Sequence, residues 1–217
     1  MSASISPWTA SGMKDKNRSL EAPVREFLEQ IVREPSRHAL FMNMLSMLEH
    51  MGSRKIMLSQ MNRVLTEDTL SHLSEEARHA YFFKRHAERI GGEKLDGFTE
   101  ENTLCRVPAL MYFGRLDAGI TKEVGEEAAY PWVSLVIELR ACWLYEIYQD
   151  VLERSGVALS LTALLAEEDQ HLADMFAQCG AQYDLLKKLS AYETGLFVKF
   201  WQKLDDSFAA VLLQAAE

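Results

Sequence analysis

Glu75-Glu76-Ala77-Arg78-His79 is the stretch of sequence that decides the fold, and Glu167-Glu168-Asp169-Gln170-His171 repeats its pattern later in the chain. Each stretch places a glutamate and a histidine three residues apart, with a second acid directly in front. On an α-helix this spacing brings the two side chains to neighbouring positions on one face, about 5–6 Å apart at Cβ. Glu76 with His79, and Glu168 with His171, are therefore predicted to bind metal as pairs.

The residues around the second motif strengthen this interpretation. One helical face through it reads Leu161, Leu164, Leu165, Glu168, His171, Leu172 and Met175. Ionisable side chains thus stand where the apolar stripe of a core-facing helix should run. A buried carboxylate must be protonated, paired or bound to metal, because leaving it uncompensated costs several kcal/mol. The alternative is a pair of solvent-facing helices in which these residues form ordinary ion pairs.

Composition limits the class of protein. The chain has 217 residues, 48% of them hydrophobic and 25% charged, and helical apolar spacing runs through most of it. These values are typical of one soluble all-α domain. The net charge of −9 and the absence of a basic stripe argue against a nucleic-acid partner. No apolar run reaches the roughly 18 residues of a membrane span. Three widely spaced cysteines without a Cys-x-x-Cys motif favour reduced thiols and a cytoplasmic location.

The apolar spacing and the helix-ending residues divide the chain into a tail, residues 1–20, and a single helical domain, residues 21–217. A flexible tail is expected because the first segment is polar. The helical domain is expected to hold a short helix, three long helices, a fourth that begins after Ser160 and a fifth long helix. Their expected ranges are 22–33, 36–65, 66–91, 121–154, 160–180 and 182–215, and Pro131 is expected to kink or restart the fourth of these. Residues 93–120 break the periodicity and are predicted to be a long crossover with one short helix at 109–115.

Two further helices carry one acid each inside an apolar stripe. Glu49 lies between Leu45 and Ile56 on one face, and Glu138 lies between Leu135 and Tyr145 on another. Glu146 is an alternative to Glu138, but its helical face turns polar towards the end, so Glu138 is preferred. The order Glu49, Glu-x-x-His, Glu138, Glu-x-x-His makes the two halves near repeats of one helical hairpin.

This set of side chains resembles the ligands of the ferritin-like di-iron or di-manganese carboxylate superfamily, which take one Glu from each of two helices and a Glu-x-x-His from each of two others. The resemblance covers about residues 36 to 180. It implies a ferritin-like antiparallel four-helix bundle with a long crossover, a short N-terminal helix and an additional long C-terminal helix. The implied metal ligands are Glu49, Glu76, His79, Glu138, Glu168 and His171.

The first motif looks like the acid-Glu-x-Arg-His element of the oxygen-activating branch, such as monooxygenases and desaturases. This resemblance makes Glu75 and Glu167 acids that orient the metal-bound histidines, with Arg78 beside them. Gln170 stands where a second Arg would be expected. Tyr145, on the same helical face as Glu138, is a candidate hydrogen-bond donor or radical relay, although such a tyrosine is more often simply packed.

The summed charge of the expected ligands favours two metal ions over one. Four carboxylates with two neutral imidazoles carry four negative charges, which two divalent ions cancel. Iron suits this donor set, and manganese or a mixed pair also fits. The expected function is a di-iron oxidoreductase that uses dioxygen on an unidentified small or apolar substrate and takes electrons from an external donor. A homodimer is possible. The alternatives are a ferritin-like protein that oxidises or stores iron, and a metal-free helical binding protein.

Overall fold

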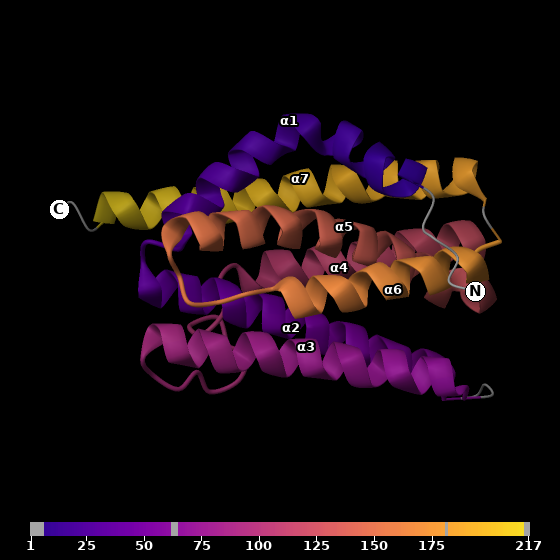
Figure 1. The fold of residues 1–217 in the computed structure, drawn as a ribbon, viewed down its shortest axis with the longest axis horizontal. Helices are drawn as coiled ribbons and strands as arrows, with labels where there is room; N and C mark the ends of the chain where they lie inside the picture. The colour runs from indigo at the N-terminus through magenta and orange to yellow at the C-terminus, as the bar shows by residue number, and fades with distance from the viewer. Residues whose placement is uncertain (1–6, 62–64, 181, 215–217) are drawn as a thin grey trace.

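The computed structural model describes residues 7–61, 65–180 and 182–214, and every regular element in these ranges is an α-helix. The all-α prediction is therefore confirmed. Seven helices lie in the described ranges (Figure 1): α1 (Pro7–Ile31), α2 (Pro35–Gln60), α3 (Glu67–Gly91), α4 (Arg106–Val124), α5 (Glu126–Ser155), α6 (Thr162–Gln178) and α7 (Tyr183–Gln214).

The structure contains two helical hairpins. The first is α2 with α3, which pack along their whole length, and the second is α5 with α6 (Figure 1). Helix α4 follows the first hairpin and packs against α5 and α7, while α1 also packs on α5. Figure 1 shows α1 and α7 on the side of α5 away from α3. Helix α5 is therefore the central element, with α2, α3 and α6 towards one side and α1 and α7 towards the other.

The predicted ends of α3 are confirmed. The side chain of Thr66 accepts a hydrogen bond from the Thr69 backbone nitrogen, which caps the first turn. Glu67 and Asp68 follow in that turn, where the helix dipole favours acids. Gly92 ends the helix at φ 73°, a left-handed conformation that glycine adopts without steric cost. These local signals fix the register of the helix that carries the first motif.

Helix α4 is longer than the sequence suggested. It covers Arg106–Val124, whereas a short helix at 109–115 inside an irregular crossover was expected. Leu116 and Ile120 are completely buried, so packing against neighbouring helices outweighs the poor helix propensity of Gly114 and Gly119. Gly119 has a packing role, because a Cβ atom there would lie 2.4 Å from the Tyr192 ring of α7.

The structure also corrects the expected start of the first helix. Helix α1 begins at Pro7, although residues 1–20 were expected to be a flexible tail and the helix to begin at Ala22. Asn17 explains the difference, since it is completely buried and its Oδ1 accepts a hydrogen bond of 3.1 Å from Arg140 on α5. Long-range contacts, which polar composition does not reveal, hold this segment.

The helices enclose one continuous apolar core. Tyr148, Phe41 and Phe83 are among its largest completely buried side chains. No helix in the described ranges is both long and apolar enough to cross a membrane.

Candidate metal centre

His72, Glu76 and Glu138 form a compact buried group between α3 and α5. His72 Nε2 lies 3.2 Å from Glu76 Oε1 and 3.4 Å from Glu138 Oε1. One ligand atom from each of the three residues lies within 4.8 Å of the others. All three side chains are nearly inaccessible, with exposed fractions of 4%, 6% and 3%. This spacing is suitable for three ligands of a single metal ion.

The charges of this group depend on one another. Burial lowers the pKa of His72, but its hydrogen bonds and attraction to Glu138 and Glu76 outweigh burial and raise the pKa to about 12. Burial and the neighbouring charge of Glu138 raise the pKa of Glu76, against the opposing effect of His72. Without metal, His72 therefore acts as the local positive charge between two carboxylates. A bound cation would take over that role.

Glu49 of α2 is the third buried carboxylate in this region. Its exposed fraction is 9%, and its Oε1 accepts a hydrogen bond from the Tyr145 hydroxyl of α5. The Tyr145 ring packs near Phe83 of α3, with ring centres 5.4 Å apart. Tyr145 thus donates a hydrogen bond to an expected ligand and ties together three helices around the site.

His79 is held by an acid from the other motif. Its Nε2 lies 2.8 Å from Glu167 Oε2 of α6, and Arg78 donates to Glu167 Oε1 at 2.9 Å. Burial raises the pKa of the Glu167 carboxyl, but the hydrogen bonds from Arg78 and His79 outweigh it and lower the pKa. A carboxylate that engages one imidazole nitrogen fixes the ring and increases the basicity of the other nitrogen, as in many metal sites. Glu75 Oε1 lies 3.9 Å from Arg78 Nη2 and accepts a hydrogen bond from the Ser71 hydroxyl.

A mostly apolar cavity of about 90 Å³ begins at the carboxylates and extends between α2, α4, α5 and α7. Glu49, Glu76 and Glu138 all line it. Among its apolar walls are Leu45, Ile56, Phe113, Val133, Ile137, Leu144 and Trp201. The three carboxylates thus line a partly open cavity whose walls are mostly apolar.

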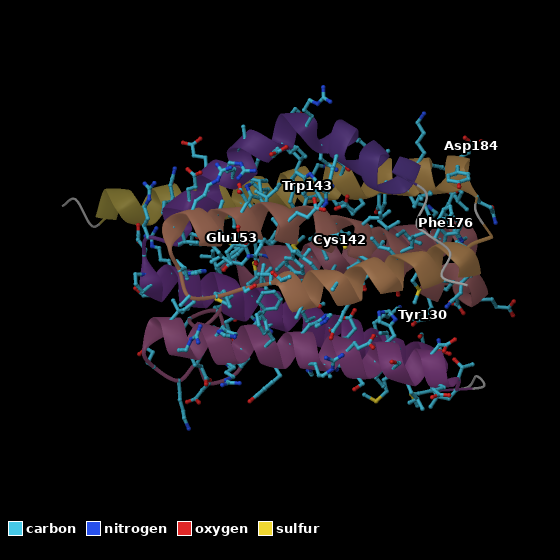
Figure 2. All side chains as sticks on the ribbon, viewed as in Figure 1. Tyr130, Cys142, Trp143, Glu153, Phe176 and Asp184 are labelled. Carbon is cyan, nitrogen blue, oxygen red and sulfur yellow. The ribbon has the colours of Figure 1, made fainter. Side chains whose placement is uncertain are left out.

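A second, more polar cavity of about 360 Å³ is lined by His72 itself. Asp68, Glu75 and Glu167 line it together with Tyr130, whose hydroxyl is 2.8 Å from His72 Nδ1. Figure 2 shows Tyr130 on the side of α5 that faces α3 and α6, whereas Trp143 lies on the side towards α1 and α7. His72 therefore lines the acidic cavity and contacts Glu76 and Glu138, which line the apolar one.

The structure brings together several of the side chains that the sequence singled out. Glu49, Glu76 and Glu138 line one cavity, and His79 contacts Glu167. Glu146, the alternative to Glu138, is exposed and forms an ion pair with Lys14 of α1 at 2.9 Å. Glu168 and His171 belong to α6, but their side chains lie outside those that the structure describes.

His72 is the site residue that sequence reasoning did not assign. The Glu-x-x-His pattern includes only histidines three residues after a glutamate, whereas His72 lies four residues before Glu76. That separation also places two side chains on one helical face. The signal was present in the face that contains His72, Glu76 and His79, and a search in both directions would have found it.

Comparison with known proteins gives no relative: no family model, no curated protein and no solved structure matches this chain.

Gly52 is predicted to be essential to the shape of the site. A Cβ atom at this position would lie 2.6 Å from Glu76 Oε2, so Gly52→Ala should displace the carboxylate and lower metal affinity about tenfold or more. Gly114→Ala is the control, because nothing lies within 4 Å of the added Cβ and the substitution favours the helix. Titration of both variants with Fe(II) or Mn(II) measures the effect. Equal metal affinities of the two variants would show that metal binding does not require the Glu76 carboxylate in its present place.

Proposed function

We propose that this protein is a di-iron carboxylate oxidoreductase that uses dioxygen to oxidise a small or apolar substrate. The observation that carries the proposal is the placement of three buried carboxylates, Glu49, Glu76 and Glu138, on the wall of one apolar cavity with His72 beside them. Neither a structural ion pair nor an ordinary core needs this combination. The ferritin-like four-helix bundle, the iron and the external electron donor belong to the same proposal.

The donor set fits the proposed metal. Carboxylate and imidazole ligands suit iron and manganese, and the mutual distances in the group of His72, Glu76 and Glu138 allow them to hold one ion. Glu49 lies on the same cavity and can serve a second ion, together with the α6 motif residues Glu168 and His171. His79, whose ring Glu167 holds, remains a further candidate ligand. Bound iron would supply dioxygen binding and electron transfer, which amino-acid side chains do not provide.

The residues of the chain have separate tasks in this proposal. Glu167 and Arg78 orient the His79 ring, and Tyr145 holds Glu49 through its hydroxyl. The apolar walls of the cavity exclude water and bind the nonpolar part of a substrate. Hydroxylation of a C–H bond consumes dioxygen with two electrons and two protons and releases water, so an external reductant must supply the electrons.

Metal analysis with absorption spectroscopy tests the proposal. Protein produced with iron supplied is expected to contain close to two iron ions per chain and to absorb in the near ultraviolet when oxidised. Removal of iron by a chelator under reducing conditions should abolish that band, and added Fe(II) with oxygen should restore it. Iron content below about half an ion per chain would refute the proposal and leave the metal-free binding protein.

Iron oxidation without an organic substrate is the second candidate function. The acidic cavity beside His72, lined by Asp68, Glu75 and Glu167, favours it because such a cavity attracts cations. Size-exclusion chromatography separates the two candidates. A closed shell of many subunits would indicate storage, whereas a monomer or dimer agrees with an oxidoreductase.

A further inference from the structure

A surface pocket of about 210 Å³ lies between α4 and α7, and none of the candidate metal ligands lines it. Its apolar floor contains Met111, Leu196 and Phe200. Three cations also line it, and no acid does. The lining residues are Pro108, Met111, Tyr112, Arg115, Leu196, Lys199, Phe200 and Lys203. The chain has a net charge of −9, yet all the charged residues that line this apolar pocket are cations. The pocket therefore favours an anionic ligand with an apolar part.

The pocket shares a wall with the cavity of the metal centre. Tyr112 and Phe200 line both of them, and their rings are stacked with centres 5.3 Å apart. The Tyr112 hydroxyl donates to Glu193 at 2.7 Å, which holds that ring in place. Phe200 has no polar group, so its ring can turn without breaking a hydrogen bond. Phe200 and Tyr112 are therefore the two side chains that a ligand must pass between the surface pocket and the inner cavity.

We propose that the pocket between α4 and α7 binds the anionic head of an amphipathic molecule whose unbranched apolar chain passes Phe200 into the cavity. Arg115, Lys199 and Lys203 are exposed and supply the positive charge. Lys203 also lies 3.3 Å from Asp206, but that pair is exposed and weakly held. That the chain serves as the substrate at the metal centre rests on the proposed function, whereas its binding does not.

The shape of the inner cavity favours a thin chain over a ring system. Its walls include Glu76 of α3 and Trp201 of α7, two helices that do not contact each other among the described residues, so it reaches across the width of α5. Its volume of about 90 Å³ is smaller than the roughly 150 Å³ cavity that accommodates benzene in a protein core. A void of this small volume that crosses α5 is narrow, so it suits the end of an unbranched hydrocarbon chain and has room for only a few methylene groups.

Isothermal titration of the full-length protein with dodecanoate, at low salt and below micelle concentrations, tests the head-group site. One dodecanoate per chain is expected, bound at least tenfold more tightly than dodecanol. Lys199→Glu with Lys203→Glu should weaken dodecanoate binding about tenfold. The control is Lys187→Glu with Lys188→Glu, which reverses two exposed charges of α7 outside the pocket and should change little. Equal binding by both double variants, or equal binding of dodecanol, would overturn the inference.

Chain length tests the path into the cavity. Affinity should rise about fourfold for each of the first methylenes added beyond hexanoate, because they enter the cavity, and should level off before dodecanoate once the cavity is full. Ala141→Phe fills the cavity that Ala141 lines and should remove this gain while leaving hexanoate binding within about twofold. A flat dependence on chain length in the wild-type protein would contradict the inner path.

The titrations are made with and without iron, which keeps the two proposals separate. Dodecanoate binding by an iron-free chain that takes up no iron would support the pocket and refute the metal centre. An iron-loaded chain that does not bind dodecanoate would support the metal centre and refute the pocket.

Discussion

Glu138→Gln is expected to weaken iron binding at least 100-fold while leaving the metal-free protein at least as stable as the wild type. Loss of groups that merely support metal ligands costs about 10- to 100-fold in affinity, so loss of a direct carboxylate ligand should cost no less. The substitution keeps the shape of a side chain that is only 3% exposed, which avoids a cavity. Metal titration and thermal unfolding of the same samples measure both effects.

The expected gain in stability follows from the charges around His72. Without metal, one imidazolium faces Glu76 and Glu138, and burial together with the charge of Glu138 raises the pKa of Glu76. Removing the second carboxylate charge leaves a balanced pair of His72 and Glu76. If the group served only to stabilise the fold, the variant would instead lose stability and show no specific loss of metal.

Glu146→Gln is the matched control on the same helix. Glu146 is exposed and pairs with Lys14, so its substitution should change stability by less than about 1 kcal/mol and leave iron content unaltered. A loss of iron in this variant equal to that of Glu138→Gln would mean that general acidity of α5, and not a specific ligand, retains the metal.

The boundaries of α3 and the buried acids could be predicted from the sequence because their signals are local, whereas the expected helix at 121–154 begins only at Glu126 because residues 121–124 belong to α4. Thr66 and Gly92 define the ends of α3 through capping geometry. Glu49 and Glu138 stand inside apolar stripes, and both are buried in the structure. Periodicity is enough for such predictions, since it states which face of a helix meets the core.

Features that depend on distant contacts could not be predicted in this way. Helix α1 includes polar residues because Arg140 binds Asn17, and α4 tolerates Gly119 because Tyr192 packs there. His72 and Glu76 are neighbours by local spacing, but the contact of His72 with Glu138, 66 residues later, does not follow from that spacing. The cavity is likewise made by side chains from several helices, so spacing along one helix contains no information about it.

Arg140 and Glu193 form the second interaction for which we expect a large effect. Arg140 Nε donates to Glu193 Oε1 at 2.8 Å and Nη2 donates to Oε2 at 2.6 Å, which joins α5 to α7. Glu193 is completely buried and Arg140 is 4% exposed. The guanidinium also lies 4.1 Å from the centre of the Phe197 ring and 4.9 Å from that of Trp143. Water therefore cannot replace either partner.

Arg140→Met is accordingly expected to destabilise the protein by about 3–5 kcal/mol, because it leaves the Glu193 charge buried without its partner. For a chain of this size the melting temperature should fall by about 6–20 °C. Adding Glu193→Gln to Arg140→Met should recover a large part of the loss, since the uncompensated charge is then removed. Lys188→Met is the control at an exposed pair, with Glu123, that also joins α7 to another helix, and it should cost less than about 1 kcal/mol. Thermal and guanidinium unfolding measure all variants. Equal losses for the single and double variants at the buried pair would mean that packing of the arginine stem, and not its charge, holds α7 on α5.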